Sequence, residues 1–222
     1  MQKFDITTPV TAFLAIPAGR VRIVAADQAP VAVEVKAADA AKSRDVKAAE
    51  QTTVVHSDGV LRIETPVKNQ YFGATGSLDV TLHLPAGSRV EATAGSAEFR
   101  TVGRLGDVTF DGAHGTAQID EAASLRLTVH AGDVSVGRLA GDSEIRVAAG
   151  DIHIAEALHG TLTLRTESGK ISVGAAHGAS ATLDAGTSHG RIHNALNNTE
   201  GAAAELNINA TTAYGDITAR SL

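Results

Sequence analysis

Four side chains that can ligate a metal or transfer a proton lie within nine positions of the segment AAGDIHIAEALHG. They are Asp151, His153, Glu156 and His159. Imidazole nitrogens and carboxylate oxygens are common zinc ligands, and the same two groups serve as general acid and base. Taken alone, the pattern D-x-H-x-x-E-x-x-H indicates the beginning of a metal site or of an acid–base site.

Two longer spacings join this segment to others. His159 and His177 lie two nine-residue steps apart, and similar intervals separate Asp133, Asp151 and Lys170. In a coil of that length, such residues would stack in adjacent turns, about 4.8 Å apart. Stacked imidazoles can bind a metal or sense pH, and an acidic ladder can supply the paired carboxylates of glycoside hydrolysis.

The simpler interpretation is that Asp and His recur because they fill polar turn positions. Each Asp of the ladder directly follows a glycine, which already accounts for its spacing. We therefore predict no catalytic, cofactor-binding or metal site and no enzyme. The candidates for any ligand site are Asp133, Asp151, His153, His159 and His177.

The elements that must position these residues repeat about every nine residues. Glycines recur at 106, 115, 132, 141, 150, 160, 169 and 178, with Gly190 and Gly215 at longer spacings. Nine segments begin at these glycines, at every one except Gly178, for example GDVTF, GDVSV, GDIHI and GKISV. In these nine segments the first and third residues after the glycine are polar. The second and fourth are apolar, apart from Ser143 and Asn194. This period of two predicts short strands with one wet face and one buried face.

A strand of about five residues buries too little to stand alone, so successive units must stack on one another. The sequence therefore predicts an all-β fold, a β-solenoid. Two units per coil and three units per coil are both compatible with it. A calcium-binding nonapeptide repeat is excluded, because each unit has one glycine and Asp follows it directly. We expect one domain over residues 1–222. In it, residues 93–222 form the repeat solenoid, and an irregular β-rich part, residues 1–92, caps it.

The N-terminal part contains alternating segments but no regular repeat. Strands are predicted at 10–16, 20–26, 31–37, 52–57, 60–65 and 78–84, with a short surface helix within 39–51. A loop over 64–77 carries Tyr71 and Phe72. This aromatic pair is either a contact point for a partner or a plug that packs back onto the core.

Composition excludes several classes of protein. The chain has no cysteine, which rules out disulfides and thiolate metal sites. Its net charge of −6 and its 3% aromatic content argue against nucleic-acid binding. No apolar run of about 18 residues and no signal-peptide pattern is present, so we expect no membrane insertion and a cytoplasmic location.

An ordered series of segments resembles a known bacterial family. The series is AGRVRIVAAD (18–27), GSLDVTLHLPAGSRVEATAGSAEF (76–99), AGDVSVGRLAGDSEIRVAAGDI (131–152), LTLRTESGKISVG (162–174) and TAYGDITAR (212–220). It is similar to the putative-adhesin family of unknown function with toastrack repeats. The resemblance implies a right-handed, single-stranded parallel β-helix, no established catalytic residues, and a cell-envelope signalling partner.

The function predicted from these features is a non-catalytic scaffold or protein-interaction module. The chain ends at YGDITARSL (214–222), one strand after its last glycine. A final rung without a cap would expose unpaired backbone groups, so we expect a homodimer or a protein partner at that C-terminal rung. The alternatives are a carbohydrate-binding or carbohydrate-active β-helix that uses Asp151 and His153, and a metal- or pH-responsive sensor that uses His159 and His177.

Overall fold

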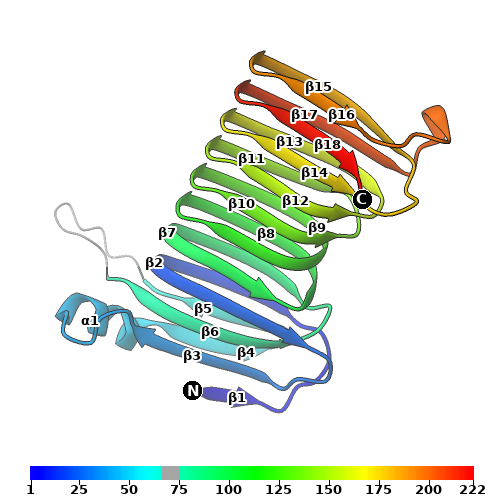
Figure 1. Cartoon of the computed structure of the whole chain (residues 1–222). Coiled ribbons are helices and arrows are strands. Elements are labelled where there is room, and N and C mark those ends of the chain that lie inside the picture. Colours follow the sequence, from blue (N-terminus) through cyan, green and yellow to red (C-terminus); the bar gives the residue numbers. More distant parts are fainter. Residues whose placement is uncertain (67–75) are drawn as a thin grey trace. The chain divides into compact units, whose positions relative to one another are not determined.

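The computed structural model describes residues 1–66 and 76–222 (Figure 1). The loop predicted around Tyr71 and Phe72 lies outside the described residues. Of the described residues, 68% are in strands and 5% in helices, which confirms the all-β prediction. The chain divides into two compact units, residues 1–115 and 116–222. That residues 1–222 form one domain, capped by residues 1–92, stays a prediction.

The second unit contains ten strands and one short 3-10 turn. In chain order they are β9 (Ala117–Ala131), β10 (Val134–Leu139), β11 (Ser143–Ala149), β12 (Ile152–Ala157), β13 (Gly160–Ser168), β14 (Ile171–Ala175), β15 (Ala181–His189), β16 (Ile192–Ala195), η1 (Gly201–Ala203), β17 (Leu206–Tyr214) and β18 (Ile217–Ser221).

Strand register shows that one coil holds two strand units. Val134 pairs with Ile152 and Ile152 pairs with Ile171, so two nine-residue units separate residues that lie side by side, and every pairing in this unit is parallel. The coils build two sheet faces, which are continuous with each other through β9. One face contains the first half of β9 with β10, β12, β14, β18 and β16. The other contains the second half of β9 with β11, β13, β17 and β15.

The predicted apolar positions form the core of this solenoid. They are almost fully buried at every interior coil, as for Ile145, Ile154 and Leu164. The two exceptions in the alternation are explained by their places. Ser143 is buried, and its hydroxyl accepts from the Leu125 N–H at 2.9 Å and donates to the Gly141 carbonyl. Asn194 is exposed on β16, where no apolar side chain is required.

The corners of the coil require glycine because the backbone of the preceding coil lies against them. Gly150 has a φ of 147°, and a Cβ there would lie 2.2 Å from the Gly132 carbonyl oxygen. At Gly215 the corresponding distance to the Gly169 oxygen is 1.9 Å. The nine-residue glycine repeat therefore reflects the close approach of stacked corners, in addition to the unusual φ.

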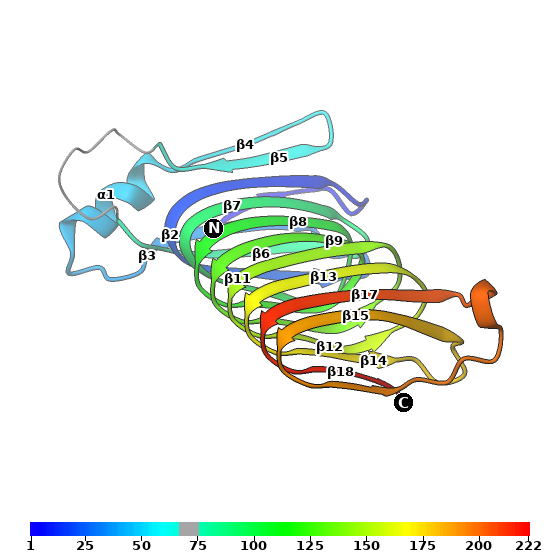
Figure 2. The same ribbon diagram turned by 90° about the horizontal axis from the view of Figure 1, so that it is seen from above.

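The order of the last rungs in space differs from their order in the chain (Figures 1 and 2). β17 pairs with β13 on one side and with β15 on the other. β18 likewise lies between β14 and β16. The prediction of an uncapped C-terminal rung is therefore wrong. After β14 the chain leaves one rung position empty and forms β15 and β16 beyond it. The chain then returns, and β17 and β18 occupy the empty position.

The charges at one corner favour the position of the returning segment in this gap. Ile217 pairs in register with Ile171 on one side and with Ile192 on the other. Asp216, Lys170 and Arg191 each come one residue before these isoleucines, so Asp216 lies between Lys170 and Arg191. The Arg191 N–H donates to Asp216 Oδ1 at 2.9 Å, and the Arg191 guanidinium lies 3.3 Å from Oδ2. Direct stacking of β16 on β14 would instead bring Lys170 and Arg191 together, which like charges oppose.

Three threonine hydroxyls show the same spatial order of coils, since each one bonds to a corner glycine of the neighbouring coil. Thr166 donates to the Gly150 carbonyl, Thr212 to the Gly169 carbonyl, and Thr187 to the Gly215 carbonyl, each at 3.0 Å. Each hydroxyl bonds to the corner of the neighbouring coil. The inserted rung therefore satisfies the same contacts as an ordinary coil.

The first unit is β-rich and mixed. Its elements are β1 (Gln2–Phe4), β2 (Thr11–Ala26), β3 (Val31–Ala37), α1 (Ser43–Gln51), β4 (Thr53–Ser57), β5 (Val60–Glu64), β6 (Leu78–Pro85), β7 (Arg89–Val102) and β8 (Arg104–His114). β2 pairs in parallel with β5, β6 and β7, whereas β3 and β4 run antiparallel to β6 and β5.

The strands and the helix predicted for this region are all present. The segments 10–16 and 20–26 form a single strand, β2, because β7 pairs along both of them. Phe99 and Phe110 stack in the core of the unit with ring centroids 4.6 Å apart.

Substitution of a corner glycine is expected to destabilise the solenoid. Gly150→Ala adds a methyl group against the Gly132 carbonyl at a positive φ, so the free energy of unfolding should fall by about 3 kcal/mol. Urea denaturation followed by circular dichroism measures the change. Gly186→Ala is the control, because a Cβ there meets only the Thr211 methyl at 3.9 Å. Equal stability of the two variants would contradict the corner contact.

The Asp216 corner predicts a pH dependence of stability. The hydrogen bond from the Arg191 N–H and the charges of Arg191 and Lys170 lower the pKa of Asp216, while desolvation opposes them. Because the folded pKa is lowered, this carboxylate stabilises the fold above the ordinary Asp pKa of about 3.9 and loses that effect as the pH falls through the folded pKa.

Wild-type protein should therefore exceed Asp216→Asn in stability at about pH 6, and the gap should narrow towards about pH 3. Denaturant titrations at both pH values give the two gaps. Asp184→Asn, a change at an exposed residue of β15, is the control. A gap that is unchanged between the two pH values would show that the Asp216 charge does not stabilise the inserted rung.

Candidate functional site

The aspartate ladder predicted from the sequence is present on the corner row of the second unit. The Asp151 N–H donates to Asp133 Oδ1 at 2.9 Å, and the Lys170 N–H donates to Asp151 Oδ1 at 2.7 Å. The Thr161 N–H donates in the same way to Asp142 Oδ1, at another corner. Each carboxylate thus accepts the backbone N–H of the next coil, which is the role of a turn residue.

This geometry accounts for the ladder without catalysis. An acid–base pair for glycoside hydrolysis needs carboxyl groups that face a substrate, whereas one oxygen of Asp133 and one of Asp151 face the backbone. His153 lies on the neighbouring outward row, beside Ser135 and Ser172 in adjacent coils. Its side chain is exposed. The structure therefore brings Asp133 and Asp151 together and sets His153 one row away.

The two predicted turn histidines, His159 and His177, are both exposed. Each follows a residue bound to the preceding coil, since the Leu158 N–H donates to the Leu139 carbonyl and the Ala176 N–H donates to the Ala157 carbonyl. After His177 the chain turns to reach β15, whereas after His159 it enters β13 directly.

Two kinds of feature are absent from the described residues. Among residues 1–66 and 76–222, no group of three or more candidate ligands is placed to hold a metal ion. No helix in the described part of the chain is long and apolar enough to cross a membrane.

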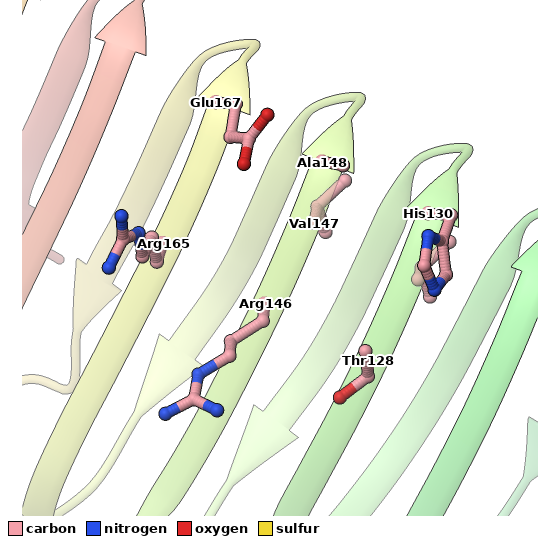
Figure 3. A pocket seen from close by; sticks show the side chains of 8 residues that line it. Thr128, His130, Arg146, Val147, Ala148, Arg165 and Glu167 are labelled. Carbon is pink, nitrogen blue, oxygen red and sulfur yellow. The ribbon is translucent and has the colours of Figure 1, made fainter.

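The structure presents a surface feature that the sequence interpretation missed. A depression of about 460 Å³ lies on the outer face of β9, β11 and β13 (Figure 3). Thr128, Arg146 and Arg165 form one row across it, because they pair in register in adjacent strands. His130 and Glu167 line its edge.

Cations dominate the row. Arg146 pairs with Glu144, two residues earlier on the same strand, and Glu144 also lies 3.8 Å from Arg126. Arg165 has no ion pair within the described part of the chain, and its register neighbours are Arg146 and Thr211. Two guanidinium groups on adjacent strands, one of them without an acidic partner, can bind an anion.

A signal for this row exists in the sequence. Thr128, Arg146 and Arg165 each lie four residues before a corner glycine, at Gly132, Gly150 and Gly169. Asp and His follow the corner glycines, and these residue types indicate metal binding or acid–base chemistry. The residues before each glycine vary in type, and their meaning appears only when two repeat units are known to make one coil.

Stacked parallel coils with glycine corners define a β-solenoid, a repeat protein in which each coil contacts only its neighbours. The chain belongs to the Toastrack DUF4097 family, whose model matches residues 75–221. The predicted family resemblance is thereby confirmed. Comparison with curated protein sequences finds no match.

A solved structure shares the fold. A putative adhesin from Bacteroides fragilis is 9% identical, with a TM-score of 0.60, over 98% of this chain and 95% of that chain. A putative adhesin from Parabacteroides distasonis is 15% identical, with a TM-score of 0.47, over 100% of this chain and 95% of that chain. The Bacteroides fragilis structure supports the fold.

The hydrogen bond between coils at Asp151 can be tested directly. Asp151→Ala removes the acceptor for the Lys170 N–H and should lower the free energy of unfolding by about 1 kcal/mol. Asp151→Asn keeps an oxygen acceptor and should remain close to wild type. Denaturant titration of the three proteins measures both values. Equal losses in the two variants would show that the Asp151 charge, and not its hydrogen bond, is what matters.

Proposed function

We propose that this chain is a non-catalytic β-solenoid that serves as a protein-interaction module, and that its partner at the rung formed by β15 and β16 is a second copy of itself. Membership of a family with adhesin-like relatives supports an interaction role. The single observation that carries the proposal is the edge of this rung, which pairs on one side only among the described residues.

The end rung has the features of a surface that associates. Ile192 is 46% exposed, and the inward residues Leu183 and Ala185 are only half-buried. Natural sheets protect their edges with lysine, proline, bulges or covering segments. β15 and β16 contain neither lysine nor proline. The connection that includes η1 lies to one side of the rungs and leaves this edge open (Figures 1 and 2).

A second copy suits this edge because the rung carries little charge. Asp184 is the only acidic residue of β15 and β16, and the nearby Arg191 is neutralised by Asp216. Two such rungs can approach without strong like-charge repulsion. A twofold dimer presents the same patch from both copies, and pairing of strand edges supplies its backbone hydrogen bonds.

The carbohydrate alternative gains no support from the Asp133–Asp151 row, whose carboxylates bind backbone N–H groups. The cytoplasmic location and a cell-envelope signalling partner stay predictions.

Sedimentation equilibrium tests the dimer. Wild-type protein should self-associate, and Ile192→Lys should shift it to monomer because a charge at the edge opposes pairing. Val55→Lys is the matched control. Val55 is 56% exposed on β4 of the first unit, so the substitution removes a similar exposed apolar side chain that is not part of the rung. Thermal melting of both variants verifies that they fold. A monomeric wild type at high concentration, or equal dissociation of both variants, would overturn the proposal.

A further inference from the structure

The row Thr128–Arg146–Arg165 has a counterpart in the first unit. There, Arg22 pairs in register with Thr81 of β6 on one side and with Arg100 of β7 on the other. This second row, Thr81–Arg22–Arg100, also crosses a surface depression, of about 320 Å³. One threonine and two arginines on three adjacent strands therefore recur, in the same spatial order, on two separate units.

The neighbouring charges leave most of these arginines without a partner. Arg20, on the row beside Arg22, is held by Asp79 through two hydrogen bonds of 2.9 Å. Arg146 is paired with Glu144. In the part of the chain that the structure describes, Arg22, Arg100 and Arg165 make no ion pair. Like charges opposite each other on adjacent strands destabilise a sheet, so both rows hold an arrangement that a bound anion would relieve.

Geometry specifies the anion. Adjacent strands place the two arginine backbones about 4.8 Å apart. Each planar guanidinium can donate two parallel hydrogen bonds to a phosphate-like group. Two guanidinium groups at that spacing can bind one tetrahedral oxyanion from two sides, and the threonine hydroxyl adds a hydrogen-bond donor. Figure 3 shows both guanidinium groups of the second unit on the outer face, with Thr128 on the neighbouring strand.

We propose that each Thr–Arg–Arg row binds one phosphate or sulfate group, free or as a monoester. A single group is favoured over a long polyanion, because the chain carries a net charge of −6 and acidic residues, Glu144 and Asp79, flank the two rows. Neither site depends on the association of rung β15–β16, so this proposal stands apart from the function proposed above.

Two-dimensional NMR titration tests the sites. Inorganic phosphate, inorganic sulfate, O-phosphoserine and glucosamine 6-sulfate are added at constant ionic strength, with chloride as the reference. Saturable shifts are expected at the amides of both rows. Arg165→Gln should weaken binding at the second unit about tenfold, and Arg100→Gln should do the same at the first unit. Each variant should leave the other site unchanged.

Arg126→Gln is the matched control, since Arg126 is exposed on β9 beside Glu144 but lies outside the row. Tighter binding of the esters than of the free ions identifies a modified sugar or side chain as the source, and the reverse order identifies the free ion. Shifts no larger than those caused by chloride, or an equal loss in Arg126→Gln, would overturn the proposal.

Discussion

Backbone hydrogen bonding between coils of two strand units is the interaction on which the second unit depends. Each strand of about five residues buries two apolar side chains, too few to fold alone, so pairing with the next coil has to provide the rest. That pairing sets the corners against one another. At Gly150 and Gly215 the space left for a side chain is smaller than a methyl group. The glycine repeat is thus a consequence of the stacking distance.

The same stacking determines what the polar corner residues do. Asp133 and Asp151 accept N–H groups of the following coil, and Thr166 and Thr212 bond to corner carbonyls. These aspartates, whose residue type suggested a catalytic or metal site, serve instead as structural hydrogen-bond acceptors. Side chains in the middle of the strands are not required for these bonds. The arginine rows consequently lie on the open sheet face, and the aspartates lie at the corners.

The inserted rung determines which strands form the end of the second unit. Because β17 and β18 fill the gap beside β13 and β14, the residues last in sequence are enclosed, and β15 and β16 form the end. The charge order Lys170, Asp216, Arg191 favours this arrangement. The end rung of this unit is therefore rich in small residues and poor in charge.

Alternation and glycine spacing alone determined the all-β class, the strands and the inward residues, because these depend on local period and on φ. The length of the coil, the insertion of the last rung and the juxtaposition of Arg146 with Arg165 were decided only by tertiary structure. Nine-residue units are compatible with coils of two or three strands, and rung order depends on contacts between residues far apart in the chain, such as Asp216 and Arg191. Local patterns carry no information about which distant strand lies alongside.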